Sequence, residues 1–153
     1  MITWAIKKFE NLSLNELYAI WNLRESVFIM EQHCFYLDAD GKDLTADHVL
    51  GYVGDRLAAY SRILYPSKPN EPIHFGRVCT HPEHRNSGLG KELIKRTMQF
   101  IKDHTDAQII EISAQSYLLK FYQGFGFSVI SDAYLDANIE HNDMRALIER
   151  DIA

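Results

Sequence analysis

Hydrophobic residues recur along this chain at two spacings, one typical of helices and one typical of strands. A first stripe at helical spacing comprises Leu17, Ile20, Trp21, Val27 and Phe28. We expect a helix over 14–31, which begins at a capping box formed by Ser13 and Glu16. A second stripe comprises Leu89, Leu93, Ile94, Phe100 and Ile101. It predicts a helix over 88–104 that packs on a sheet.

Short apolar runs bounded by turn residues predict the strands of that sheet. We expect strands over 2–6, 48–53, 56–64, 73–80, 108–114, 127–134 and 142–148. Gly54-Asp55 is typical of a two-residue hairpin turn. A polar, acidic loop covers 32–47, and a short helix near 116–123 ends at Gly124. This order predicts one α/β domain over 1–153, with a mixed sheet and helices on its faces.

Composition and charge narrow the class of protein. About 46% of the residues are hydrophobic, but no apolar run reaches the roughly 18 residues of a membrane span. The first residues do not form a signal peptide, so we expect a cytoplasmic protein without a membrane partner. Cys34 and Cys79 form no CxxC pair and would stay reduced there. The net charge of −5 argues against a nucleic-acid partner.

One charged residue interrupts the first helical stripe. Arg24 falls on the same face as its apolar neighbours, between Trp21 and Val27. A charge in such a position needs a partner or a function. The alternative is a long side chain that reaches solvent at the edge of the stripe.

A glycine-rich turn follows the expected strand 73–80. It reads Arg85-x-x-Gly88-x-Gly90 and opens the second helix. The start of a helix presents unpaired N–H groups and the positive end of the helix dipole, and glycines let a ligand approach the backbone. The turn therefore predicts a phosphate site, in particular for a pyrophosphate.

Two common phosphate motifs do not fit this turn. In a P-loop, Arg85 would stand in place of the first glycine and Glu92 in place of the hydroxyl that binds magnesium. In a dinucleotide fingerprint, Leu93 would stand in place of the last glycine. The pattern that remains is Arg/Gln-x-x-Gly-x-Gly/Ala.

This remaining pattern resembles motif A of the GNAT acetyltransferases. The segment 114–127, with Phe121-Tyr122 followed by Gly126-Phe127, resembles motif B of the same superfamily. The resemblance implies a GNAT-type fold, with a mixed, mostly antiparallel central sheet and helices on both faces. It also implies acetyl-CoA as cosubstrate.

The first half of the chain resembles the ElaA-like branch of that superfamily. The segment 23–32, the acidic residues of 36–43 and the dipeptide Ala114-Gln115 carry this likeness. Two positions depart from the pattern: Asn86 replaces a frequent glycine, and Phe35 replaces a frequent proline. Neither change removes a backbone N–H that the cofactor would need.

The resemblance implies a cofactor site made largely of backbone. Val78, Cys79 and Thr80 would offer strand-edge groups to the pantetheine arm. The pyrophosphate would be held by residues 85–91 (Arg85, Asn86, Ser87, Gly88, Leu89, Gly90 and Lys91). Gln115 would hydrogen-bond the pantetheine.

The resemblance also suggests catalytic residues. Tyr122 is the predicted general acid, which protonates the leaving thiolate of coenzyme A; the alternative is a tyrosine of the core. Four candidates for the base that takes the proton of the amine remain open: Glu31, His48, Glu111 and His141. Cys79 as a covalent relay is disfavoured because it lies within a strand without an activating partner.

The expected acceptor pocket lies at the end of the first helix. It comprises Arg24 and Gln32, together with Tyr36 and Asp38 of the acidic loop. For Arg24 the alternative is a buried clamp between arginine and carboxylates that holds the acidic loop. No metal is expected, because the acidic loop does not fit a calcium loop and the histidines and cysteines lack zinc spacing.

These observations predict an acetyl-CoA-dependent N-acetyltransferase. A primary amine of a small molecule or peptide would attack the bound thioester directly. The alternative is a non-catalytic sensor or interaction module that binds acyl-CoA. GNAT proteins often form dimers, so a homodimer is compatible with the resemblance.

Overall fold

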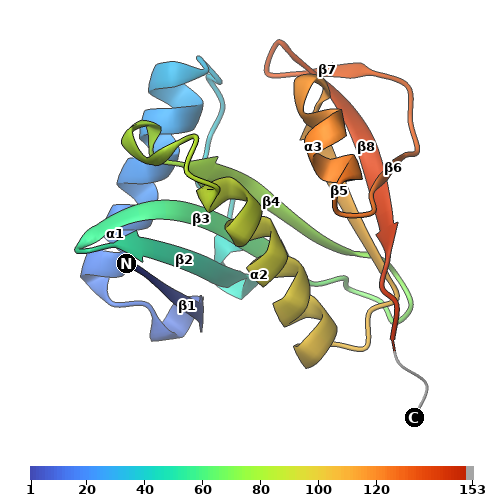
Figure 1. Ribbon diagram of the computed structural model, residues 1–153, viewed down its shortest axis with the longest axis horizontal. Coiled ribbons are helices and arrows are strands. Elements are labelled where there is room, and N and C mark those ends of the chain that lie inside the picture. The colour runs from blue at the N-terminus through green and yellow to red at the C-terminus, as the bar shows by residue number, and fades with distance from the viewer. Residues whose placement is uncertain (151–153) are drawn as a thin grey trace.

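The computed structural model describes residues 1–150. Eight strands form one sheet, and four helical segments and several short 3-10 turns accompany it (Figure 1). The strands are β1 (Ile2–Lys8), β2 (Asp47–Val53), β3 (Arg56–Leu64), β4 (Ile73–Thr80), β5 (Ile109–Gln115), β6 (Ser128–Val129), β7 (Tyr134–Asp136) and β8 (Ile139–Leu147). The helices are α1 (Leu14–Arg24), the π-helical segment η2 (Glu25–Glu31), α2 (Leu89–His104) and α3 (Leu119–Gln123). The 3-10 turns are η1 (Phe9–Asn11), η3 (Lys42–Thr45), η4 (Pro82–His84) and η5 (Ser116–Leu118).

The sheet is mostly antiparallel and contains one parallel pair. Its order is β1-β2-β3-β4-β5-β8-β6, and β7 pairs with β8. The parallel pair is β4 with β5, joined at only two positions, Ile73 opposite Ile110 and His74 opposite Glu111. Beyond these positions the two strands diverge, and Figure 1 shows the sheet opening between them. This divergence creates the site described below.

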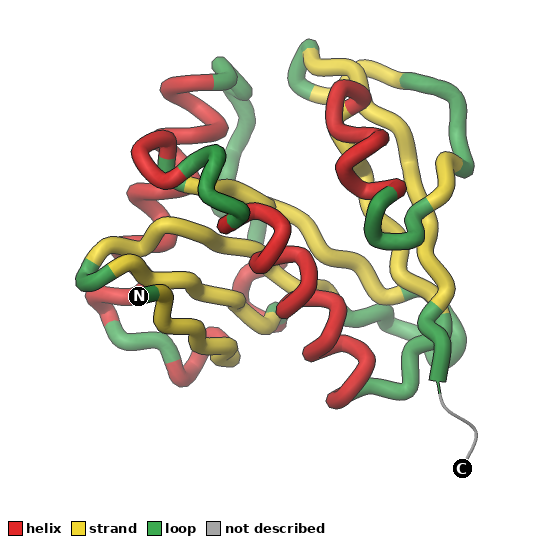
Figure 2. Tube along the Cα trace, in the orientation of Figure 1, coloured by secondary structure: helices red, strands yellow, loops and turns green. Residues whose placement is uncertain are grey.

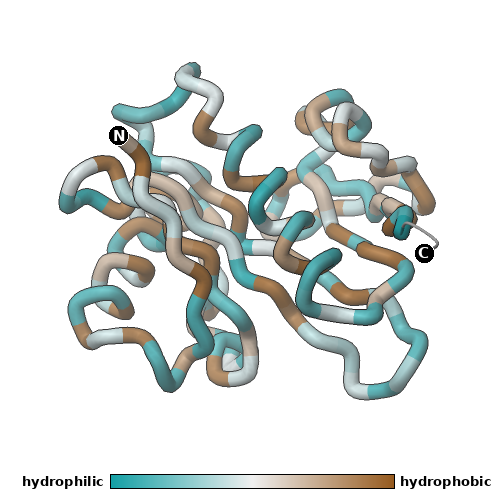
Figure 3. Tube along the Cα trace, turned by 60° about the horizontal axis from the view of Figure 1, so that its bottom comes forward, coloured by the Kyte–Doolittle hydropathy of each residue, from teal (hydrophilic) through white to brown (hydrophobic). Residues whose placement is uncertain are grey.

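Helices cover both faces of the sheet (Figure 2). The consecutive residues Val49 and Leu50 of β2 belong to two different hydrophobic clusters, because neighbouring side chains in a strand point to opposite faces. The cluster around Val49 contains the buried side of α2, and the cluster around Leu50 contains α1 and η2. Figure 3 shows hydrophilic residues on many of the outer loops and hydrophobic residues along the inner segments. The predicted mixed α/β fold is confirmed.

The first helix begins where its sequence predicts, and after Arg24 it continues as the π-helical segment η2. The Ser13 hydroxyl accepts from the Glu16 N–H at 3.0 Å, and Glu16 accepts from the Ser13 N–H at 2.8 Å. Trp21 does not face the core as expected; it is 56% exposed, and its indole donates to Glu25 at 2.8 Å. The buried stripe instead includes Leu23, which the sequence analysis did not select, because the face centred on Ile20 and Leu23 leaves Trp21 at its edge.

The last two strands differ from the prediction of 127–134 and 142–148. Only short pieces of the first, β6 and β7, pair with β8, which already begins at Ile139. The Ser131 hydroxyl accepts from the Asp143 N–H at 2.8 Å, so a side chain replaces a backbone partner between β6 and β7. Ala137 and Asn138 both have positive φ and close a tight hairpin that only Asn138 signals in the sequence.

The longest helix, α2, has 16 residues. Within residues 1–150, no helix is both long enough and apolar enough to cross a bilayer.

Candidate active site

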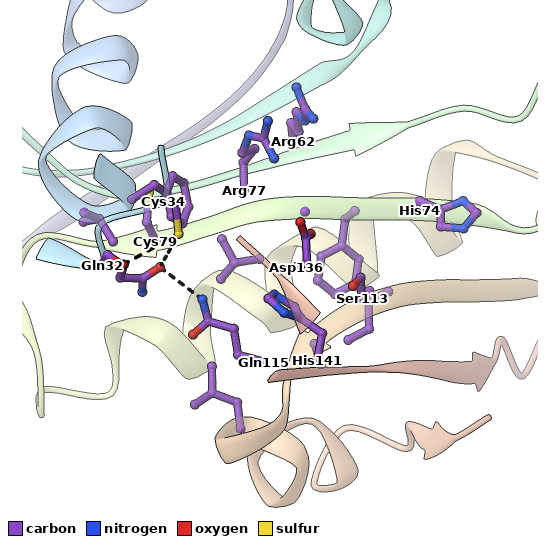
Figure 4. Close-up of a pocket in the computed structure, with 18 of the residues that line it drawn as sticks. Gln32, Cys34, Arg62, His74, Arg77, Cys79, Ser113, Gln115, Asp136 and His141 are labelled. Carbon is purple, nitrogen blue, oxygen red and sulfur yellow. Dashed lines mark hydrogen bonds between the residues drawn. The ribbon is translucent and has the colours of Figure 1, made fainter. Parts of the chain in front are cut away.

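A cleft of about 830 Å³ occupies the opening between β4 and β5. Its walls come from β4, β5, η2, α3, the acidic loop and the β7–β8 hairpin (Figure 4). Gln115 of β5 donates to the side chain of Gln32 across the cleft at 3.0 Å, as the dashed line in Figure 4 marks. The cleft therefore lies between two halves of the sheet that are linked by side chains.

The edge of β4 that faces the cleft has no strand paired to it beyond His74 among the described residues. On its other edge β4 carries a bulge, since Tyr60 is opposite Cys79 but Arg62 is opposite Gly76. Arg77, at the bulge, has a φ of 50°. Unpaired backbone groups along an open strand can hydrogen-bond an extended ligand with amide groups. Val78, Cys79 and Thr80, the predicted strand-edge residues, all line the cleft.

The glycine-rich turn over residues 85–91 follows β4 and opens α2. Gly88 has a φ of 82° and provides no capping side chain for α2, whose first intrahelical bond is that of the Glu92 N–H to Gly88 at 3.1 Å. The N–H groups of Leu89, Gly90 and Lys91 therefore have no partner within the helix. Asn86 also adopts a left-handed conformation, with a φ of 63°. The loop can receive an anion through its backbone.

Arg85 joins this loop to the opposite wall. Its guanidinium donates to both carboxylate oxygens of Glu31, at 2.5 and 2.7 Å, and to the Thr80 carbonyl at 3.1 Å. The bond to Arg85 holds the pKa of Glu31 below its usual value. Glu31 lines the cleft, but both of its oxygens are already occupied, which makes it a poor proton acceptor.

Tyr122 lies in the wall formed by α3. Its ring is 5% exposed and meets Phe121 and Phe127 edge to face, with centroids 5.1 and 5.9 Å away. Burial raises the pKa of the phenol, so the hydroxyl keeps its proton at neutral pH. Among the hydrogen bonds of residues 1–150, none involves this hydroxyl. The phenol can therefore donate a proton to a group bound in the cleft.

His141 lines the cleft from β8, directly opposite Gln115 in the sheet. Its Nδ1 lies 2.7 Å from the carbonyl oxygen of Ile139. A carbonyl can only accept, so Nδ1 must carry a proton, and in the neutral ring Nε2 is the free acceptor. The ring of Tyr134 stacks on His141 with an interplanar angle of 20°. In the neutral ring Nε2 is thus the nitrogen that can accept a proton.

The other two base candidates lie outside the cleft lining. His48 is 1% exposed and uses both nitrogens, with Tyr60 at 2.6 Å and the Asp43 carbonyl at 2.9 Å. Its burial lowers its pKa. Glu111 lies in β5 beside Arg145, with 3.4 Å between their polar atoms. Neither contributes to the cavity wall.

The predicted acceptor residues divide into two groups. Gln32 and Tyr36 line the cleft, whereas Arg24 and Asp38 do not. Arg24 is 3% exposed and lies 2.9 Å from Asp38 and 2.6 Å from Asp43. This geometry corresponds to the alternative interpretation, a buried clamp that holds the acidic loop.

The clamp extends to two arginines that the sequence analysis did not select. Arg62 lies 2.7 Å from Asp40, and Arg77 lies 2.9 Å from Asp38 and 5.1 Å from the centre of the Tyr36 ring. Both arginines line the cleft. The bond from Arg62 holds the pKa of Asp40 well below its usual range. Periodicity could not have found these residues, because their partners are about 20 to 40 positions away in the chain.

Metal ligands do not gather in this part of the structure. Within residues 1–150, no group of three or more His, Cys, Asp or Glu side chains is arranged to hold an ion.

A split mixed sheet, with an open strand edge leading to an uncapped helix start, can receive an extended ligand that carries both amide and phosphate groups. The chain belongs to the GNAT acetyltransferase family, since residues 29–148 match the model of the acetyltransferase (GNAT) domain. Members of this family use acyl-CoA and transfer its acyl group.

Individual relatives place the chain in the predicted branch. It is 38% identical to protein ElaA of Escherichia coli K12 over 146 residues, which cover 94% of this chain and 95% of the relative. The crystal structure of E. coli ElaA superposes with a TM-score of 0.91 at 36% identity, over 95% of this chain and 99% of that one. The structure of an acyl-CoA N-acyltransferase from Pseudomonas aeruginosa has a TM-score of 0.88 at 34% identity, over 95% and 99%.

Proposed function

We propose that this protein transfers the acetyl group of acetyl-CoA to a primary amine of a small molecule or peptide. The observation that carries the proposal is the continuity of three features along one cleft. These are the open edge of β4, the uncapped start of α2 and the protonated phenol of Tyr122.

Acetyl-CoA would lie along the edge of β4. Its pantetheine amides would pair with the backbone of Val78, Cys79 and Thr80, and its pyrophosphate would meet the N–H groups of residues 86–91. Gln115 would donate to the pantetheine only after its hydrogen bond to the Gln32 side chain breaks. Arg85 keeps Nε–H and one Nη1–H beyond its bonds to Glu31 and Thr80, so it can add charge to the phosphate site.

The amine would attack the carbonyl carbon of the thioester directly. A C–N bond forms as the C–S bond breaks; Nε2 of His141 takes a proton from the amine, and Tyr122 donates its proton to the departing thiolate. A relay through Cys79 is disfavoured, because burial raises the pKa of that thiol to about 12. Glu31 remains a second candidate base, but it would first have to leave Arg85.

Calorimetric titration with acetyl-CoA tests the cofactor, with ATP and NAD as controls. We expect binding of acetyl-CoA alone, in the micromolar range (about −8 kcal/mol). Absence of binding by the folded protein would overturn the proposal. Binding without release of coenzyme A for any amine or peptide would favour the alternative, a non-catalytic acyl-CoA sensor.

A further inference from the structure

Charged side chains line the cleft, and most of them neutralise one another. Arg85 pairs with Glu31 at 2.5 Å. Arg62 and Arg77 pair with aspartates of the acidic loop, at 2.7 and 2.9 Å. These pairs leave little net charge for a ligand to recognise.

Two ionised residues of the cleft wall have no such partner within residues 1–150. They are Lys42, in the acidic loop, and Asp136, at the end of β7. Neither side chain takes part in a salt bridge or a hydrogen bond of the described residues. The free charges of the cleft are therefore one cation and one anion, on different segments.

Lys42 stands in a corner of the cleft beside Arg62. Its backbone N–H and the Arg62 guanidinium both donate to one oxygen of Asp40, at 3.0 and 2.8 Å, so Lys42 and Arg62 are neighbours. Nε of Arg62 is buried and has no acceptor among the described residues. Thr45, Tyr65 and His74 also line the cleft, and His74 is opposite Leu64 in the sheet, two residues from Arg62.

The carboxylates near this corner are already engaged. Asp40 and Asp43 accept from Arg62, and Asp47 accepts from the hydroxyl of Tyr65. Because Arg62 and Tyr65 already donate to these carboxylates, the free charged donor that remains for a ligand is the Lys42 ammonium, and a carboxylate can form a charge-assisted hydrogen bond with it.

Asp136 lies beside the proposed base. Tyr134 is opposite His141 in the hairpin, and Asp136 is two residues beyond Tyr134, so all three side chains share one face. Figure 4 shows the side chains of Asp136 and His141 in the space between β4 and β8. A free carboxylate at this position attracts an ammonium group and brings it to Nε2 of His141.

We propose that the acceptor is a short peptide with a free amino terminus and a free carboxyl terminus. This inference rests on the function proposed above. The amine would meet Asp136 and His141, and the carboxylate would meet the ammonium group of Lys42. His74 and Val78 are four positions apart in β4; a regular strand would place them about 13 Å apart, and the bulge at Arg77 shortens this distance. An extended tripeptide spans about 10 Å, whereas the amine and carboxylate of one amino acid are too close together.

The test compares trialanine with trialaninamide, which lacks only the terminal charge, and with free alanine. Release of coenzyme A gives kcat and KM, and calorimetry without cofactor gives peptide binding. We expect a KM for trialanine about fivefold to tenfold below that for trialaninamide, because a charge-assisted contact is lost in the amide. Lys42→Glu should reverse this difference without lowering kcat, because the new carboxylate repels that of trialanine, and Asp136→Asn should raise KM for both peptides alike. Lys95→Glu, an equal charge change on the outer face of α2, should change neither.

Equal KM values for the acid and the amide in the unaltered protein would overturn the inference. So would a loss in Lys42→Glu that is the same for both peptides, or a preference for free alanine. Failure to bind acetyl-CoA would instead overturn the proposed function. In that case the Lys42-dependent difference in peptide binding, measured without cofactor, would still decide the inference by itself.

Discussion

The proposed cofactor wall of the cleft, formed by β4 and residues 85–91, presents consecutive residues and mainly their backbone. The proposed acceptor wall, formed by the acidic loop, η2 and the β7–β8 hairpin, presents side chains from distant segments. Arg24, Arg62 and Arg77 hold the acceptor wall together through buried aspartates. A backbone site tolerates changes of side chain, whereas a charged network depends on each member. The two walls should therefore respond differently to mutation.

The largest effect is expected from Arg24→Met. Removing this buried guanidinium leaves Asp38 and Asp43 with fewer partners and should lower the free energy of unfolding by about 3–5 kcal/mol. Urea denaturation measures the loss. Arg56→Met is the matched control, because Arg56 pairs with Glu83 at the surface and should cost no more than about 1 kcal/mol. Equal losses in both variants would show that the clamp does not support the fold.

Tyr122→Phe tests the proposed general acid, which lies in α3. Loss of the general acid should lower kcat on the order of 10²-fold. Affinity for acetyl-CoA should stay nearly the same, because the ring and its packing remain. Steady-state release of coenzyme A and calorimetry provide the two values. Tyr117→Phe removes a hydroxyl from an exposed tyrosine at the same cleft and should leave kcat unchanged. Unaltered turnover in Tyr122→Phe would refute its role.

Two glycines offer a direct comparison of the walls. Gly88 and Gly41 have φ values of 82° and 83°, and a Cβ on either would meet no atom within 4 Å. Alanine at each position should therefore cost a similar amount, about 1–2 kcal/mol of stability. Only Gly88→Ala should also weaken acetyl-CoA binding, by about tenfold or 1.4 kcal/mol. If Gly41→Ala weakened it as much, the cofactor site would extend into the acidic loop.

The smallest effect concerns pH. Burial lowers the pKa of His48 in the folded protein, so the unfolded chain binds this proton more tightly. The contribution of His48 to stability is therefore complete above about pH 6.5 and falls as the pH drops below it, by on the order of 1 kcal/mol. Chemical denaturation at pH 7 and pH 5 measures this slope.

His48→Gln should flatten that slope. His81→Gln is the control on the cofactor side, because the pKa of His81 is also lowered by burial but the ring is much more solvated. Equal slopes in the unaltered protein and in His48→Gln would assign the pH dependence to other groups.

Local patterns anticipated most of the fold. The strand at 73–80 has the expected bounds, and the capping box at Ser13 is present. One wrong prediction was the long strand over 127–134, where the Ser131 side chain replaces a backbone partner. Another was the burial of Trp21, which lies at the edge of the buried helical stripe. Such competition depends on contacts that spacing does not encode.

For the same reason, the sequence predicted some residues of the candidate site and missed others. Glycine spacing identified the turn at Gly88, because a left-handed backbone and close approach have local signatures. Arg24 was recognised as unusual, but its partners Asp38 and Asp43 decide whether it serves the ligand or the fold. Asp136 was missed because its position depends on the β7–β8 hairpin.

By itself, the sequence determined the family, the order of helices and strands, and the glycine-rich turn that opens α2, because each depends on residues a few positions apart. Only the tertiary structure decided which charged side chains form salt bridges and which have no partner among the described residues of the cleft. It also showed that the Ile139 carbonyl orients His141. Pairing of charges depends on distances in space, and residues as far apart as Glu31 and Arg85 become neighbours only when the chain folds.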